Sequence, residues 1–284
     1  MSSIHAHVAA ARQQLRAAGL SFAEADLSAR LLAEHLLGWS TERFLVEAVE
    51  PEPDGFSARY DAIIARRAAR EPVPYITGRR EFWGLSFEVT PDVLIPRPET
   101  ELIVEATLDL FPDAASPLRV ADLCTGSGCV AIAIAHERPR ATTLATDISN
   151  AALAVARRNA VRHGVADRMQ FECADLLQNV SGTFDLIVAN PPYVRSGDRP
   201  ALQPEVREEP DVALFSGPEG LDVTRRLIAD GPAFLRHGAH LVFEFGLGQD
   251  VEIEGLINAS RSLTLIEMRR DLQGIARTAI ARRV

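Results

Sequence analysis

The chain has 284 residues, of which 47% are hydrophobic, and its formal net charge is −9 with a sequence pI of about 5.3. This length is sufficient for one large α/β domain and a smaller second domain with ordinary globular cores. The negative charge argues against a long basic surface for duplex nucleic acid. All 30 basic residues are arginine, so a Schiff-base lysine, a P-loop lysine and a lysine general base are excluded.

The cysteines and the apolar segments further narrow the classes of protein to which the chain can belong. The three cysteines, Cys124, Cys129 and Cys173, are odd in number and lack CxxC spacing, so we expect neither a disulfide framework nor a metal site. The N-terminal segment has no continuous apolar run, and no stretch approaches the length of a membrane span. We therefore expect a cytoplasmic protein that does not bind a membrane.

The N-terminal part of the chain has the apolar spacing of helices. Ser21 followed by Glu24 is a capping box at the start of one helix, and Gly19 and Gly38 lie where helices are expected to end. The sequence predicts a small helical bundle over residues 1–72.

Prolines and glycines interrupt this pattern in the next segment, EPVPYITGRREFWGLSFEVTPDVLIPRPETE. Its short β-type runs and internal glycines are typical of a hairpin. We expect a β-hairpin linker over residues 73–98.

From residue 99 to residue 284, apolar strands alternate with helical segments, which predicts βαβ units and a mostly parallel sheet with helices on both faces. The expected parallel strands are RVADLC, TTLATD, MQFECADL, FDLIVAN and HLVFEFG. We expect a helix over residues 221–236 and another near residues 249–259. Two closing strands, SLTLIEMRRD and IARTAIARR, are expected to pair antiparallel at a sheet edge.

The segment DLCTGSG, residues 122–128, follows the first of these strands and precedes a helix. Gly126 and Gly128 allow a tight turn and close backbone approach, and the helix N-terminus provides free N–H groups. Such a loop suits a nucleotide-like ligand, although glycine turns at strand ends are common. The dinucleotide pattern GxGxxG is not present, because Val130 and Ala131 follow.

Two further strands end in an acidic residue, Asp147 and Asp175. At this edge of a parallel sheet, an acidic side chain can accept both hydroxyls of a ribose. The alternative for Asp147 is that it only helps to cap the helix after Ser149. The glycine turn and the two carboxylates together predict a nucleoside pocket, whose ligand needs no phosphate because no lysine is present to hold one.

The segment ANPPYV ends the fourth strand at the same edge, where a single proline would be enough for a turn. Two successive prolines remove two N–H donors and leave rigid carbonyl acceptors, while Asn190 adds an amide oxygen and Tyr193 an aromatic face. We interpret this arrangement as a binding site for a planar NH2 group. Such a nitrogen is a poor nucleophile unless its N–H bonds are held while it pyramidalises toward an electrophile. A methyl group on a sulfonium, carried by a nucleoside, fits the neighbouring pocket.

DLCTGSG, LATD and NPPY together resemble a class I S-adenosylmethionine-dependent methyltransferase that acts on a planar amino group. A wider set of stretches, covering most of residues 73–278, is similar to the PrmC/HemK family: PYITGRREFWGLSFEV, PDVLIPRPETE, ISNAALAVARRNA, NPPYV, EVREEPDVAL, GPEGLDVTRRLI, LVFEFGLGQ and RDLQGIAR. The resemblance implies a Rossmann-like methyltransferase domain over residues 99–284, with a seven-stranded sheet and an antiparallel edge. It also implies an N-terminal helical bundle that recognises the substrate protein.

The activity that this family resemblance implies is methyl transfer from S-adenosyl-L-methionine to a protein. The acceptor would be the side-chain amide of the glutamine in the GGQ motif of bacterial class-1 peptide-chain release factors. The implied cofactor-binding residues are Cys124, Thr125, Gly126, Ser127 and Gly128 for the methionine part, Asp147 for the ribose, Asp175 and Leu176 beside the adenine, and Asn190. The implied substrate-binding residues are Arg97, Asn190, Pro191, Pro192 and Tyr193, and the catalytic residues among them are Asn190, Pro191 and Tyr193.

Cys124 stands where the family usually has glycine, and a cysteine would be strained there if the position needs a positive φ. Arg97 and Glu101 resemble family landmarks near the site, and the sequence does not separate binding from structure for them. One alternative is an N-methyltransferase acting on adenine or guanine amino groups of nucleic acid, which the charge and the lack of a basic domain disfavour. Another is a catalytically idle cofactor-binding module, which the intact NPPY disfavours. We expect a monomer, and the preferred release factor is not readable from the sequence.

Overall fold

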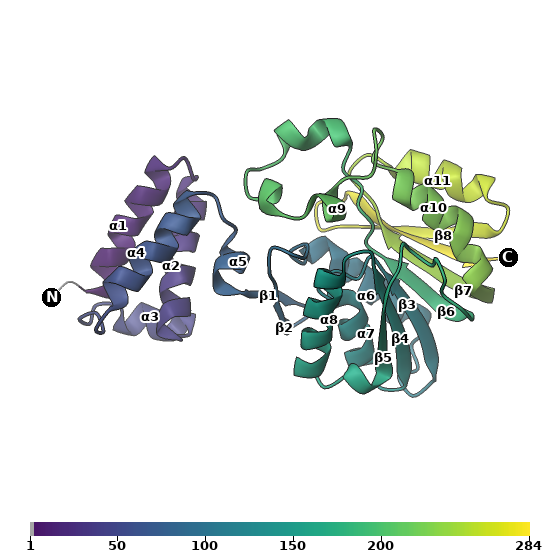
Figure 1. Cartoon of the computed structure of the whole chain (residues 1–284), viewed down its shortest axis with the longest axis horizontal. Helices are drawn as coiled ribbons and strands as arrows, with labels where there is room; N and C mark the ends of the chain where they lie inside the picture. Colours follow the sequence, from purple (N-terminus) through teal and green to yellow (C-terminus); the bar gives the residue numbers. More distant parts are fainter. Residues whose placement is uncertain (1–2) are drawn as a thin grey trace. The chain divides into compact units, whose positions relative to one another are not determined.

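The structure, a computed structural model, describes residues 3–284. The chain forms two compact units (Figure 1). The helical unit runs to Gly78 and also contains Gln203–Glu208, whereas the α/β unit contains Arg79–Leu202 and Glu209–Val284. Each unit is described by itself below.

The helical unit contains α1 (Ile4–Ala17), α2 (Phe22–Leu37), α3 (Thr41–Glu47), α4 (Phe56–Ala68) and α5 (Val73–Thr77). The capping box at the start of α2 is confirmed: the Ser21 hydroxyl accepts from the Glu24 N–H, and the Glu24 carboxylate accepts from the Ser21 N–H at 3.0 Å. Gly38 ends α2 in the left-handed conformation at φ 64°. The buried hydroxyl of Tyr60 donates to the Ala29 carbonyl at 2.7 Å and joins α4 to α2.

The helical unit extends beyond the boundary that we expected at residue 72, because α5 contacts α2 and α4. It also includes a segment from far along the chain. Glu205 lies 2.8 Å from the Arg67 guanidinium and 3.2 Å from that of Arg70. Arg67 is buried, so Glu205 supplies the opposite charge that a buried guanidinium requires.

The α/β unit begins with the hairpin of β1 (Arg79–Phe82) and β2 (Leu85–Glu88), which pair antiparallel. Its two turn residues, Trp83 and Gly84, both have positive φ, as a type I′ turn requires. Glu101 accepts a hydrogen bond from the Trp83 N–H at 2.9 Å. This contact gives Glu101 a structural role in holding the hairpin turn.

The sheet of this unit has seven strands: β3 (Leu118–Leu123), β4 (Ala141–Asp147), β5 (Met169–Cys173), β6 (Phe184–Ala189), β7 (Leu235–Glu244), β8 (Leu263–Arg270) and β9 (Ala276–Arg283). Their order is β5-β4-β3-β6-β7-β9-β8. Neighbours from β5 to β7 pair parallel, and β9 pairs antiparallel with both β7 and β8. The predicted mostly parallel sheet with an antiparallel edge is therefore confirmed.

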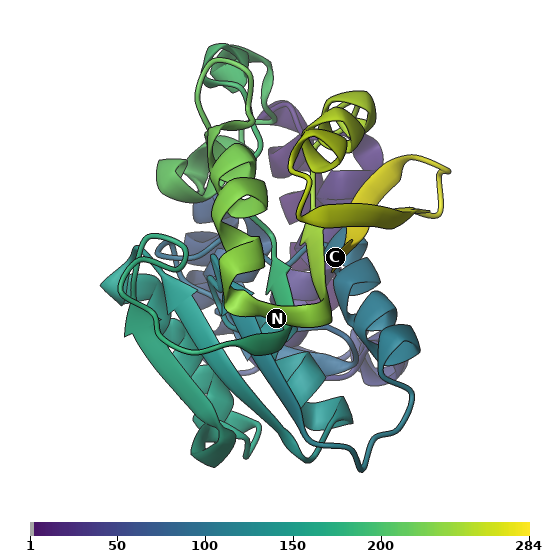
Figure 2. The same ribbon diagram turned by 90° about the vertical axis from the view of Figure 1, so that its right-hand side faces the viewer.

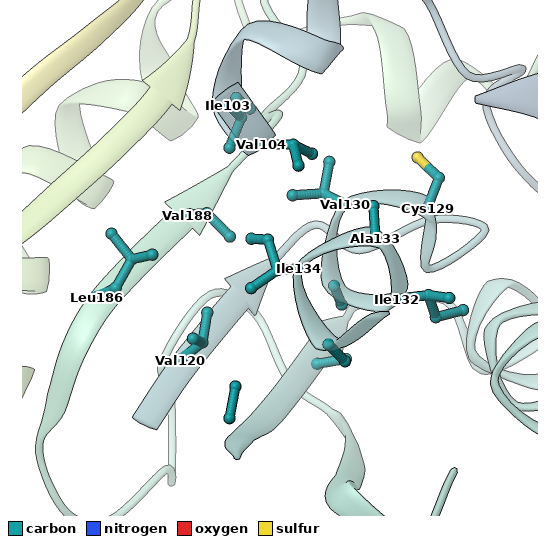
Figure 3. Close-up of a cluster of buried hydrophobic side chains, with 14 of the residues drawn as sticks. Ile103, Val104, Val120, Cys129, Val130, Ile132, Ala133, Ile134, Leu186 and Val188 are labelled. Carbon is teal, nitrogen blue, oxygen red and sulfur yellow. The ribbon is translucent and has the colours of Figure 1, made fainter. Parts of the chain in front are cut away.

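Helices cover both faces of the sheet (Figures 1 and 2). One face carries α6 (Glu101–Leu110), α7 (Cys129–Glu137) and α8 (Asn150–Arg162), and the other carries α10 (Asp222–Asp230) and α11 (Asp250–Ala259). Successive residues of a strand serve opposite faces: Val120 packs in the cluster under α7, and Ala121 packs in the cluster under α10 and α11. Figure 3 shows Ile134 of α7 next to Val120 and Val188. Burial on both faces explains why these strands are apolar throughout.

The remaining short elements are η1 (Pro98–Thr100), η2 (Ala166–Arg168), η3 (Ser196–Ala201), η4 (Val206–Glu208), α9 (Asp211–Leu214) and η5 (Gly231–Phe234). The helix that we expected over residues 221–236 is wrong at its C-terminal end. It stops at Asp230, and β7 already begins at Leu235. Pro232 has no N–H to donate within a helix, and the preceding Gly231 further weakens it.

The strand order reverses between β3 and β6, because β4 lies on one side of β3 and β6 on the other. Ligands of open α/β sheets bind beyond the carboxyl ends of strands at such a reversal. No helix within residues 3–284 is both long enough and apolar enough to cross a bilayer.

Candidate active site

A cavity of about 250 Å³ opens beyond the carboxyl ends of β3, β4, β5 and β6. Nine of the predicted site residues line it: Cys124, Thr125, Gly126, Ser127, Asp147, Asp175, Leu176, Asn190 and Pro192. Four others, Gly128, Pro191, Tyr193 and Arg97, are outside its wall as the described part of the chain forms it. The structure thus brings most of the predicted residues together, while their roles in binding and catalysis stay predictions.

The loop after β3 is held by hydrogen bonds to neighbouring strand ends. The Thr125 N–H donates to the Thr146 carbonyl at 3.0 Å, and the Thr125 hydroxyl donates to Asp122 at 2.6 Å. Gly128 has φ 81°, and a Cβ there would lie 3.1 Å from both Ala156 and Ile132. Gly128 therefore serves the close approach of α7 and α8, whereas Gly126 faces the cavity.

Cys124 has φ 58°, so this position does require the left-handed conformation. An L-residue there is strained by about 1–2 kcal/mol, which explains the usual glycine. The concern raised by the sequence is therefore borne out by the backbone. Burial raises the pKa of the Cys124 thiol, which keeps it neutral.

Asp147 binds backbone donors on both sides. One carboxylate oxygen accepts from the Gly126 N–H and the other from the Ser149 N–H, each at 2.9 Å. The Ser149 hydroxyl in turn caps α8 by accepting from the Ala152 N–H. Asp147 thus supports the helix start and also shapes the glycine loop. Burial raises the pKa of Asp147, and backbone hydrogen bonds from Ser149, Gly126 and Ile148 oppose this rise.

Asp122 and Ser127 are buried polar residues of this wall, each 2% exposed. Burial raises the pKa of Asp122 to about 7. Among residues 3–284, the Ser127 hydroxyl has only the Cys129 sulfur, a weak hydrogen-bonding group, as a partner. An under-satisfied buried hydroxyl and a buried carboxylate beside open space are what a polar, cationic ligand would satisfy. Asp122 was not among the predicted site residues, although an acidic residue at the end of an apolar strand was a usable signal.

The wall beyond β5 is formed by Asp175, Leu176 and a residue that the sequence did not indicate. Arg226 of α10 lies 2.9 Å from Asp175. Leu176 is 6% exposed, has φ 55°, and its carbonyl accepts from the Thr146 hydroxyl at 3.0 Å. A fixed apolar side chain next to an ion pair can border a flat heterocycle.

The NPPY segment after β6 is tied to a buried carboxylate at the end of β7. The Tyr193 hydroxyl donates to Glu244 at 3.1 Å, and the Thr100 hydroxyl donates to the other Glu244 oxygen at 2.6 Å. The Asn190 amide NH2 donates to the Thr100 hydroxyl at 3.0 Å. Burial raises the pKa of Glu244 to about 7. Thr100 and Glu244 were missed, because their partners come from distant parts of the chain.

Tyr193 is not among the residues that line the cavity, and its role as an aromatic face for the substrate stays a prediction. Its hydroxyl donates to Glu244, and its carbonyl accepts from the Gln249 side chain at 3.2 Å. Gly220 permits this packing, since a Cβ there would lie 2.3 Å from the Tyr193 carbonyl oxygen. Tyr193 therefore holds the segment in place.

Arg97 forms an ion pair with Glu209, which is 4% exposed. Glu209 also accepts from the Ile95 N–H at 3.0 Å. These contacts fix the loop before η1, so the structure gives Arg97 a structural role. Binding of substrate by Arg97 stays a prediction.

Comparison with known proteins identifies both parts of the chain. Residues 7–78 match the PrmC N-terminal domain, and residues 101–212 match the methyltransferase small domain. The release factor glutamine methyltransferase of Cereibacter sphaeroides is 43% identical, with 96% of each chain covered. That of Burkholderia pseudomallei is 42% identical, with 95% of each chain covered.

A solved structure shares the fold at low identity. The Thermus thermophilus 16S rRNA N2 G1207 methyltransferase, solved with AdoMet and guanosine, has a TM-score of 0.52 and 18% identity. The match covers 72% of this chain and 49% of that one. At this identity the similarity shows the fold alone.

The buried carboxyl of Asp122 generates a prediction about pH. Its pKa rises from an ordinary 3.8 to about 7 on folding, so the folded state binds this proton more tightly than the unfolded state. This group therefore lowers stability as pH rises through that interval. Asp122→Asn removes the titration. The free energy of unfolding of Asp122→Asn minus that of the unmodified protein should be larger at about pH 8 than at about pH 5, by at least about 1 kcal/mol. Urea unfolding at both pH values measures this, and a pH-independent difference would contradict it.

The left-handed backbone at Cys124 generates a second prediction. Cys124→Gly should be more stable than Cys124→Ala by about 1 kcal/mol, because alanine keeps the Cβ that strains this φ. Thermal unfolding of the two variants measures the difference. The comparison with alanine controls for loss of the thiol, and equal stabilities would show that the position is not strained.

Proposed function

Because the chain belongs to the release factor glutamine methyltransferase family, we propose that it methylates the glutamine side-chain amide in the GGQ motif of bacterial class-1 peptide-chain release factors, using S-adenosyl-L-methionine. The observation that carries the proposal is that Asn190 and Pro192 line the same cavity as the glycine loop and Asp147. An acceptor for an amide N–H thus adjoins a pocket suited to a nucleoside.

The residues of the cavity fit this cofactor. The backbone from Cys124 to Gly128 would hold its methionine part, Asp147 its ribose, and Asp175 and Leu176 its adenine. The buried Ser127 hydroxyl gains a partner, and the buried carboxylates favour a cationic ligand. When bound, S-adenosyl-L-methionine supplies an electrophilic methyl group on a positively charged sulfur.

The NPPY segment acts on the substrate amide. In the substrate amide, the nitrogen lone pair is delocalised into the carbonyl. The site must therefore stabilise the form in which this nitrogen pyramidalises and its N–H bonds become more acidic. The Asn190 side-chain oxygen and the Pro191 carbonyl would accept these two N–H groups. Such fixed acceptors stabilise the charge that develops on nitrogen, and no charged general base is needed.

We assign recognition of the release factor to the helical unit. Leu45 and Val46 of α3, and Val49 just beyond it, are 73%, 74% and 70% exposed. Adjacent exposed apolar side chains are a feature of protein-binding surfaces. A glutamine side chain alone offers little contact area, so a second surface is required for affinity.

Methylation of nucleic acid is the competing function. The fold does not decide between the two, because an rRNA guanine methyltransferase shares it. The net charge of −9 and the match of residues 7–78 to a PrmC N-terminal domain favour the protein substrate.

The proposed function predicts one methyl group on the glutamine of GGQ when the protein is incubated with release factor and S-adenosyl-L-methionine. Peptide mass spectrometry locates the added mass. A release factor with Gln→Ala in this motif is the control and should stay unmodified. Label in RNA or DNA, or in the Gln→Ala factor, would contradict the substrate assignment.

Two substitutions separate cofactor binding from chemistry. Asp147→Ala should weaken S-adenosyl-L-methionine binding by roughly 1.5–3 kcal/mol, because a buried charge-assisted hydrogen bond is lost. Asn190→Ala should lower kcat on the order of a hundredfold, which is far more than it lowers this affinity. Calorimetric titration and initial rates measure the two effects. Full turnover by Asn190→Ala would show that NPPY is only a turn.

A further inference from the structure

The amide of Asn190 can face the cavity in two ways that differ little in shape. One presents the oxygen, which accepts a hydrogen bond, and the other presents the NH2 group, which only donates. A substrate NH2 needs the oxygen. Something in the protein must therefore select one orientation.

The selection comes from the single proton of the Thr100 hydroxyl. This oxygen lies 2.6 Å from Glu244 and 3.0 Å from the Asn190 amide nitrogen. An ionised carboxylate has no proton to donate, so the Thr100 proton must point to Glu244. The hydroxyl is then left only with acceptor capacity toward Asn190, and it binds the NH2 side of the amide.

We propose that Thr100 and Glu244 are positioning residues that fix the Asn190 amide with its oxygen toward the substrate. The inference rests on the proposed function for the nature of the substrate amide. Neither residue touches the reacting nitrogen in this scheme. They act through Asn190, from η1 and from the end of β7.

The surroundings of Glu244 are suited to this role. Glu244 and Thr100 are each 2% exposed, so water does not compete for their hydrogen bonds. The second Glu244 oxygen accepts from the Tyr193 hydroxyl, which leaves both oxygens engaged by protein donors. Two charged groups also act on Glu244: Arg277 of β9 favours its ionised form and Glu99 of η1 opposes it.

Protonation of Glu244 removes the selection. A neutral carboxyl can donate to the Thr100 oxygen, so the Thr100 proton is free to bind the Asn190 oxygen. The Asn190 amide can then rotate into the opposite orientation. Since burial raises the pKa of Glu244 to about 7, the correctly oriented form is lost as pH falls through this value. Methyl transfer should therefore rise with pH through about 7 in the unmodified protein. The rise should be smaller in Glu244→Gln, which leaves only the contribution of Asp122, whose pKa burial also raises to about 7.

Three variants test the role of the hydroxyl on the full chain with S-adenosyl-L-methionine and release factor. Thr100→Val keeps the shape and removes the hydroxyl, and kcat should fall roughly 10- to 100-fold with little change in cofactor affinity. Thr100→Ser restores the hydroxyl and should recover most of the rate. Thr107→Val is the matched control, because Thr107 is a buried threonine of α6 whose hydroxyl bonds only the Ile103 carbonyl among the described hydrogen bonds.

A double substitution distinguishes positioning from general stability. If Thr100 acts through Asn190, adding Thr100→Val to Asn190→Ala should slow methyl transfer no further. The proposal would be overturned if the rate losses of the two single variants multiplied in the double variant, or if Thr100→Val alone left the rate unchanged.

Side-chain amide NMR tests the orientation without turnover. The Asn190 NH2 signals, identified by their loss in Asn190→Ala, should shift in Thr100→Val and stay unchanged in Thr107→Val. Unshifted signals in Thr100→Val would overturn the proposal. A protein that does not methylate release factor at all would contradict the proposed function instead, and the NMR result would still decide the orientation.

Discussion

The carboxylate of Glu244 is buried at the end of β7, and a buried carboxylate requires hydrogen-bond donors. Its donors come from Thr100 at the start of α6 and from Tyr193 in the NPPY segment. This requirement joins segments that lie far apart in the sequence. Hydrogen bonds to the end of β7 and to the residue before α6 therefore fix the position of the NPPY segment.

Two more strands end in buried or partly buried carboxyl groups at the same edge, Asp122 on β3 and Asp147 on β4. Burial raises the pKa of both, because no guanidinium lies among their described partners. These buried carboxyl groups thus lower the stability of the fold, and a positively charged ligand bound beside them would stabilise their ionised forms. Arg226, the cation that lines the cavity wall, lies against Asp175 instead. The carboxyl groups of Asp122 and Asp147 thus lie beside the glycine loop with no arginine among their described hydrogen-bond partners, and a cationic ligand there would favour their ionised forms.

The sequence predicted the parallel sheet, its antiparallel edge and nine residues of the cavity wall, because these follow from local patterns. Strand ends of a parallel sheet meet at one edge, so residues such as Asp147 and Asn190 could be placed together without coordinates. Thr100, Glu244 and Arg226 could not be found in this way. Each acts through a partner that is distant in sequence, and a buried threonine or glutamate is locally no different from a packing or surface residue. The end of α10 was misjudged because Pro232 was included in a helix that it terminates.

The chain path after NPPY bears on how the two units work together. Val194 pairs with Leu214 and Ser216, so the base of the excursion between them is fixed within the α/β unit. The middle of this excursion, Gln203–Glu208, belongs to the helical unit through the ion pairs of Glu205. The chain returns to the α/β unit at Glu209, which forms an ion pair with Arg97. The backbone therefore passes from the NPPY segment into the helical unit and returns to the α/β unit at Glu209. Any partner that shifts this segment acts on residues covalently continuous with Pro192. The recognition role that we propose for the helical unit is thus connected to the site by two chain crossings in addition to the linker after Gly78.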